Sequence, residues 1–144
     1  LIMATYGGWG LDESFTAATN LSASQWHFVQ AGSISGEVAI CTGGSIPGPI
    51  GILQNDPVAG EQATVRLFGI SKLSACAAIQ PGAAASAIIM GDFLVSGSSG
   101  TGYHSSGTGS ALNAIALEAL SGGGIIKVLI LPPGATAIAD RGAA

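Results

Sequence analysis

Apolar and polar residues alternate most clearly between Ile50 and Ser74, and this stretch predicts two strands joined by a loop. The loop contains Asn, Asp, Pro and Gly, which favour turns. From residue 63 to residue 67 apolar and polar side chains alternate strictly, which is the period of a strand with one buried and one solvated face. Gly69 interrupts this alternation and predicts a bulge or a corner in the second strand. The stretch contains no catalytic group, so we interpret it as scaffold.

Shorter stretches of strand-forming residues recur along the chain. Turn-forming residues separate them at intervals of roughly eight to twelve residues, which is typical of an all-β sandwich or barrel. The most apolar stretch is expected to lie centrally in a sheet or to pair between subunits, because an exposed edge of this composition aggregates. The stretches outside the hairpin cover residues 25–31, 37–41, 93–95 and, as the most apolar, 125–131.

Two segments between these strands are ambiguous. Residues 111–120 fit one face of a helix and also fit a strand, and their intrinsic propensity favours a helix. Residues 75–90 are rich in alanine, but Pro81 and Gly82 interrupt them near the middle, so short strands around a turn are expected rather than one helix. The predicted fold class is all-β, a compact sandwich or barrel of short strands with an extended N-terminal arm.

The pattern divides the chain into three parts. Residues 1–24 have no regular period and are predicted to form the arm, which becomes ordered by lying on another surface. Residues 25–131 are predicted to form the β domain. Residues 132–144 are a tail of small residues with little to hold it in place.

Three aromatic residues of the arm, Tyr6, Trp9 and Phe15, are candidates for binding a partner. Aromatic side chains on an extended segment bury a large area at little cost in rotamer entropy, so they suit an interface. The alternative for Tyr6 and Trp9 is that they fold back onto their own domain, because large aromatic residues usually belong to a core.

The surface is expected to consist mostly of small, uncharged residues. Four basic and eight acidic residues make up only 8% of the chain, against about 25% in ordinary soluble domains, and there are 23 glycines. Such a surface does little to keep a monomer apart from its neighbours, which favours a protein that works inside an assembly. A soluble β domain with a neutral surface remains the alternative.

Charge and hydropathy argue against nucleic acid and membrane as partners. The net charge is −4, and the four basic residues form no cluster that would match a phosphate backbone. The longest apolar run is too short to span a bilayer. The first residues lack the basic and apolar regions of a signal peptide, so synthesis and folding in a cytoplasm are expected.

No arrangement of reactive residues predicts an enzyme, a metal site or a cofactor. The chain has no Gly-x-Ser-x-Gly motif, and its two histidines, His27 and His104, are expected to be surface or loop residues rather than bases. Cys41 and Cys76 lie in apolar surroundings and are expected to be buried free thiols. None of these residues has the spacing of metal ligands.

Three segments together carry a resemblance to a known family. They are GILQNDPVAGEQATVRLFGI at Gly51–Ile70, GDFL at Gly91–Leu94 and ALEALSGGGIIKVLIL at Ala116–Leu131. Their order and distances resemble those of the small capsid cement, or head decoration, proteins of tailed bacteriophages. The resemblance covers about residues 26–131. It departs from the family pattern at residues 79–91, where this chain has an additional alanine-rich segment.

The resemblance implies a structural protein rather than an enzyme. Its partner would be the major capsid protein, and it would bind the outer surface of an assembled phage head, often as a homotrimer, and stabilise the shell. It also implies a strand within residues 111–120, against their helix propensity. The alternative function is a phage-surface module that binds a glycan or a host receptor through the loop at residues 96–110, which carries Tyr103.

Overall fold

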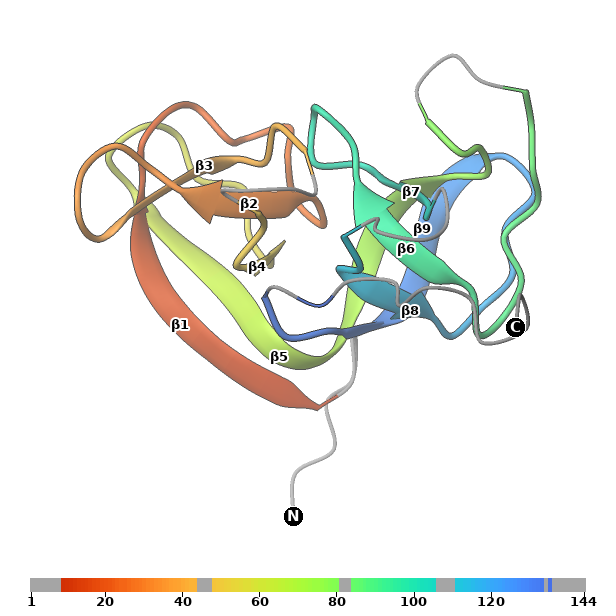
Figure 1. Ribbon diagram of the computed structural model, residues 1–144. Helices are drawn as coiled ribbons and strands as arrows, with labels where there is room; N and C mark the ends of the chain where they lie inside the picture. Colours follow the sequence, from red (N-terminus) through yellow and green to blue (C-terminus); the bar gives the residue numbers. More distant parts are fainter. Residues whose placement is uncertain (1–8, 44–47, 81–83, 106–110, 134, 136–144) are drawn as a thin grey trace.

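The computed structural model describes residues 9–43, 48–80, 84–105, 111–133 and 135, and within these residues it is an all-β protein (Figure 1). The all-β prediction is confirmed: the described residues contain no helix, and therefore none that is long and apolar enough to cross a membrane. The strands are β1 (Gly10–Ala17), β2 (Phe28–Ala31), β3 (Glu37–Ile40), β4 (Gly51–Leu53), β5 (Gln62–Cys76), β6 (Phe93–Ser96), β7 (Gly102–His104), β8 (Ala114–Ala116) and β9 (Gly123–Ile130).

All nine strands belong to one mixed sheet, which closes on itself twice. The strand order is β1-β3-β2-β4-β5-β7-β6-β8-β9, with additional pairings of β1 with β5 and of β5 with β9. Strands β1 to β4 therefore form one closed circuit with the first half of β5, and strands β6 to β9 form a second closed circuit with its second half. Figure 1 shows β5 as a long bent strand running through both halves of the molecule.

The bend in β5 lies where the sequence predicts a bulge or a corner. Gly69 is the residue at which β5 changes partner, since it is opposite Gly10 of β1 and also opposite Ile130 of β9. Its φ is +104°, a backbone conformation that residues other than glycine rarely adopt. The pairing with β1 skips Leu67, so the irregularity in register falls two residues before the glycine.

Each circuit encloses its own apolar core, and the two cores meet at β2 and β4. Phe28 and Ile52 are opposite each other on strands of the first circuit, yet both are fully buried in the core of the second. Their chain neighbours Val29 and Leu53 point the other way into the first core. One wall of the first circuit thus closes the core of the second.

The N-terminal boundary differs from the expected one. Residues 10–17, which the sequence pattern assigns to an arm, form β1. This strand pairs with β5 from Gly10 to Thr16 and with β3 at Thr16 and Ala17. The pattern hides this strand because residues 11–14 are all exposed, so only the end of β1 shows an inward side chain. Residues 1–8 lie outside the described part of the chain, as do residue 134 and residues 136–144 of the expected tail.

The predicted hairpin is confirmed as the antiparallel pair β4–β5, and the apolar run near residue 130 as β9, which lies between β5 and β8. The first predicted strand starts later than expected, at Phe28 rather than residue 25. The reason is Trp26, whose φ of +67° takes the backbone out of the extended region. Its backbone is held by hydrogen bonds from Trp26 N–H to Leu53 and from Ser74 N–H to Trp26.

The two ambiguous segments both adopt extended structure. Within residues 111–120 the helix favoured by propensity is absent; Ala114–Ala116 form β8, with both alanines buried and Ile115 facing outwards. Packing of these alanines against the second core overrides their helix preference. Between residues 79 and 91 the described residues make isolated bridges, from Ala85 to Ala78 and from Ile88 to Leu120, instead of a regular strand.

Asn113 provides a test of how the second circuit is closed. Its side-chain oxygen accepts a hydrogen bond from the Ser96 backbone N–H at 2.8 Å in a buried position. We expect Asn113→Ala to lower the free energy of unfolding by about 1–3 kcal/mol, because a buried N–H is left without its acceptor. Denaturant unfolding measures this. Asn20→Ala removes a comparable but exposed bond to Ser22 N–H and should cost less; equal losses would contradict the argument.

Candidate interaction surface

The outer face of the second circuit carries a row of apolar side chains. Register places Phe93 of β6 opposite Ile115 of β8, Ile115 opposite Leu129 of β9, and Leu129 opposite Ile70 of β5. Their neighbours along each strand, such as Leu94 and Val128, are fully buried in the core, so these four side chains point outwards. Phe93 is 47% exposed. An apolar row that crosses four strands on the solvent side is unusual for a protein that remains alone.

Two lysines form the next outward row on the same face. Lys72 of β5 and Lys127 of β9 are directly opposite each other. The Lys72 ammonium lies 5.4 Å from the centre of the Trp26 ring, which is within the range of a cation–π interaction. Like charges directly opposite each other on two strands repel, so this row is better suited to a negatively charged partner than to water alone.

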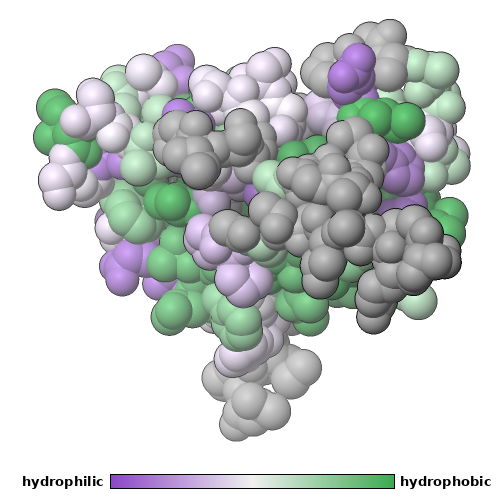
Figure 2. All heavy atoms as spheres, in the orientation of Figure 1, coloured by the Kyte–Doolittle hydropathy of each residue, from purple (hydrophilic) through white to green (hydrophobic). Residues whose placement is uncertain are grey.

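A second apolar group lies where β1 meets the bend of β5. Trp9 and Phe68 make an edge-to-face ring contact with centroids 5.6 Å apart, and Leu11 is opposite Phe68 in register. Trp9 and Leu11 are each more than half exposed, at 57% and 59%. In Figure 2 apolar residues gather on the lower part of the molecule, where Figure 1 shows the bend of β5 and the start of β1. We call Trp9, Leu11 and Phe68 the bend cluster.

The three predicted partner-binding residues are not brought together. Trp9 belongs to the bend cluster and is exposed. Phe15 is opposite Ala63 and packs against the core of the first circuit, so it serves its own domain. Tyr6 lies outside the described residues. Phe68 was not singled out as a surface residue, because an apolar residue inside an alternating strand looks like a core residue in sequence.

A tight turn projects two further apolar side chains that sequence reasoning missed. Ile89 and Met90 are 61% and 71% exposed. The turn is closed by a hydrogen bond from Asp92 N–H to the Ile89 carbonyl oxygen at 3.1 Å, and Gly91 at its third position has φ +97°. The Asp92 carboxylate also accepts the Ile89 N–H at 2.8 Å. The Gly-Asp pair in the sequence was the available signal for this turn.

The turn is braced from two sides. Its Gly91 N–H donates to the Ala116 carbonyl oxygen of β8 at 2.7 Å. On the other side, His104 Nε2 lies 2.8 Å from the Ala87 carbonyl oxygen, and its Nδ1 lies 3.6 Å from the Asp92 carboxylate. A rigid turn with exposed apolar side chains loses little entropy on binding, which suits it to a contact with a partner. The predicted loop histidine thus has a structural role.

The histidines and cysteines of the described residues do not form a metal-binding cluster. No group of three histidine, cysteine, aspartate or glutamate residues lies close enough to hold an ion within this part of the chain. The Nδ1 atom of His27 lies 3.0 Å from the Gln25 carbonyl oxygen. Cys41 is buried and free, and Cys76 is free and half-buried, so the expectation of free thiols holds while full burial applies to Cys41 alone.

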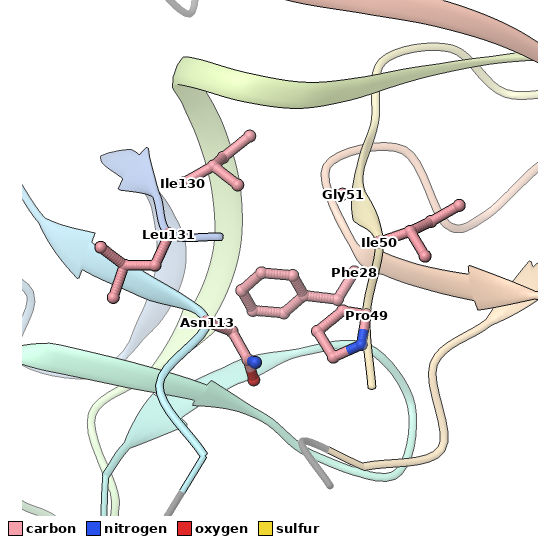
Figure 3. A pocket seen from close by; sticks show the side chains of 7 residues that line it. All are labelled: Phe28, Pro49, Ile50, Gly51, Asn113, Ile130 and Leu131. Carbon is pink, nitrogen blue, oxygen red and sulfur yellow. The ribbon is translucent and has the colours of Figure 1, made fainter. Parts of the chain in front are cut away.

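A hollow between the two circuits is too small to serve as a ligand site. It opens to solvent and leaves essentially no space for the centre of a water molecule, so a ligand has no room in it. Figure 3 shows the Phe28 ring in this space, between the β4 side and the end of β9. The hollow is lined by Phe28, Pro49, Ile50, Gly51, Asn113, Ile130 and Leu131.

Tyr103, the aromatic residue of the alternative glycan-binding loop, is not part of this hollow. It is half-buried opposite Val95 of β6. Its ring lies so close to Gly97 that a side chain there would collide with it. Burial, and secondly the neighbouring Cys76, raise the pKa of the Tyr103 hydroxyl above its usual value. The ring therefore packs on its own loop, and residues 106–110 of that loop lie outside the described part of the chain.

Comparison with known proteins gives a match in fold only. No protein-family model and no curated protein matches the sequence. Among solved structures, the head fiber gp8.5 N base of bacteriophage phi29 matches with a TM-score of 0.61 and 15% sequence identity, covering 85% of this chain and 95% of that chain. The likeness spans nearly all of both chains, so this chain shares the whole fold of that base.

Proposed function

We propose that this chain is a structural protein associated with the head of a bacteriophage. The observation that supports the proposal most is the likeness in fold to a phage head fiber base, which extends over 85% of this chain. The cement-like segments of the sequence support the same class of protein independently, because they rest on residues and not on the backbone.

The finer proposal is that the chain binds the outer surface of the assembled head through the major capsid protein, as a homotrimer, and stabilises the shell. A trimer that touches several capsomers at once raises the effective concentration of each contact, so that weak single contacts give an avidity gain of about 10²–10⁴. The low charge of the chain and its exposed apolar residues suit repeated contacts of this kind. The chain would then act without a cofactor and without catalysis.

The braced turn at Ile89–Asp92 is the proposed contact with the shell. Ile89 and Met90 are the most exposed apolar pair that the structure holds in a rigid turn. Truncating a hot-spot residue at the centre of an interface costs about 2 kcal/mol or more, and each 1.4 kcal/mol is a tenfold change in affinity. The double substitution Ile89→Ser and Met90→Ser is therefore expected to weaken binding to heads by on the order of tenfold or more.

Co-sedimentation with heads that lack the protein measures this binding. The matched control is Ile34→Ser with Val58→Ser, which removes two exposed apolar side chains from loops of the first circuit. The control should bind heads as the unchanged protein does. If the unchanged protein did not co-sediment, and heads with and without it resisted heat equally, the proposed function would be wrong. If only the control variant lost binding, the shell contact would lie on the first circuit.

A further inference from the structure

The charges of the described residues are distributed unevenly between the two circuits. The first circuit and its loops hold five carboxylates against one guanidinium, which leaves four surplus negative charges; the second holds two lysines against two carboxylates. The carboxylates of the first circuit are Asp12, Glu13, Glu37, Asp56 and Glu61. The molecule is therefore acidic at one end and carries its lysines at the other.

The lysine row borders the apolar row on the outer face of the second circuit. Ile70 and Leu129 are two residues before Lys72 and two residues after Lys127 on their strands, so the two rows are adjacent. Glu118 lies beside this row, because its carboxylate accepts the Lys127 backbone N–H at 2.9 Å. Two lysines against this one carboxylate leave the row with a surplus positive charge. This surface therefore presents apolar side chains beside positive charge, and we call it the lysine face.

Strand β1 presents apolar side chains beside negative charge. We call the surface formed by the bend cluster and Glu13 the β1 face. The bend cluster supplies exposed apolar side chains there, and Glu13 is exposed two residues beyond Leu11 on the same strand. Asp12 is already neutralised, because Arg66 donates to its two carboxylate oxygens at 2.7 and 3.0 Å. Glu13 accepts only the N–H of the following Ser14 among the contacts of the described residues, and so it keeps its charge for a partner.

We propose that the lysine face of one copy docks against the β1 face of a second copy, with Glu13 of one copy near Lys127 of the next. Apolar side chains meet apolar side chains in this contact, and negative charge meets positive charge. A contact that places either face on its own copy would bring lysines against lysines or carboxylates against carboxylates, which costs electrostatic energy. The contact is therefore between two different faces, and such contacts generate closed rings when their rotation closes.

This inference rests on the proposed homotrimer and deepens it by naming the two faces that meet. It also separates self-association from shell binding within the molecule. The lysine face and the β1 face join copies to one another, and the braced turn at Ile89–Asp92 remains available for the shell.

Charge reversal tests the contact directly. The mass of the free protein, measured by light scattering across a range of concentrations, should correspond to a closed ring. Lys127→Glu alone and Glu13→Lys alone should each weaken association by on the order of tenfold or more, and the double variant should restore it to within a few fold of the original. Asp56→Lys, the same charge change on a loop of the first circuit, should leave the mass unchanged. All three positions are exposed, so circular dichroism should show unchanged folding.

Three results would overturn the inference. One is a protein that stays monomeric at every concentration while it still binds heads, which leaves the proposed function intact. Another is an oligomer whose mass neither single reversal changes. The last is loss of association in both single variants without recovery in the double variant. Conversely, rings that form as described but never bind heads would leave the inference standing and the proposed function wrong.

Discussion

Phe28→Ala is expected to lower the free energy of unfolding by about 3–5 kcal/mol, the range found for the removal of a buried aromatic ring. Phe28 is 1% exposed, and its ring fills the core of the second circuit although its backbone belongs to the first. The backbone around it cannot easily collapse, because Phe28 N–H donates to the Gly100 carbonyl oxygen and Cys41 N–H donates to the Phe28 carbonyl oxygen. The cavity should therefore persist and the full cost should appear.

Denaturant unfolding measures this loss, and hydrogen exchange shows where it acts. We expect faster exchange in β8 and β9 after Phe28→Ala, on strands that do not pair with β2. Ile52→Ala should behave in the same way, because Ile52 shares that core. Leu53→Ala removes a neighbouring, equally buried side chain from the first core and should act mainly on β1 and β3. A loss below about 1.5 kcal/mol, or exchange altered in the first circuit alone, would contradict the coupling of the two cores.

Gly69→Ala is expected to cost about 2–5 kcal/mol, because two penalties add at this position. A non-glycine residue at positive φ costs roughly 1–2 kcal/mol, and overpacking costs typically 1–3 kcal/mol more. At Gly69 a Cβ would collide with the Trp9 carbonyl oxygen and with Gly10 Cα, which are backbone atoms that cannot rotate away. The clash lies at the residue where β5 exchanges β1 for β9.

Gly60→Ala is the matched control for this prediction. Gly60 has a similarly positive φ of +85°, but a Cβ there meets nothing within 4 Å. It should cost only the backbone penalty, so the difference between the two variants measures the close approach of β1 and β5. Thermal unfolding of both variants, at matched concentration and pH, gives this difference. Equal stabilities for the two variants would show that β1 can move aside, and that the bend does not depend on glycine at this position.

Sequence reasoning succeeded where one strand carries its own pattern. The β4–β5 hairpin and β9 could be predicted because alternating or continuous apolar residues are read from neighbours in the chain. The corner at Gly69 could be predicted because only glycine tolerates its backbone conformation cheaply. These features depend on local information.

The features that could not be predicted from the sequence depend on pairing partners far away in the chain. Strand β1 has exposed residues from Leu11 to Ser14, and what makes it a strand is its pairing with β5, about fifty residues later. Strand β8 has a helical composition, and the buried contacts of its two alanines decide its structure. The closure of the sheet into two circuits follows from pairings such as β5 with β9, which no local pattern encodes.

The same limit applies to the candidate surface. Of the three predicted aromatic residues, Trp9 is exposed, Phe15 packs inwards and Tyr6 lies outside the described residues. The residues that make Trp9 part of a surface, Leu11 and Phe68, come from two strands and become neighbours only through register. Exposed apolar residues cannot be told from core residues until the two faces of each strand are known.

Sharing one strand between two circuits also sets an order of events during synthesis. The first circuit consists of β1 to β4 and the first half of β5, so it can close when β5 has emerged from the ribosome. The second half of β5 pairs along its whole length with β9, which begins at Gly123 and is made about fifty residues later. During that interval a strand edge is left unpaired, and such edges invite association between nascent chains. Slowing synthesis after β5 has left the ribosome and before β9 has left it should therefore raise aggregation, whereas slowing it once β9 has emerged should not.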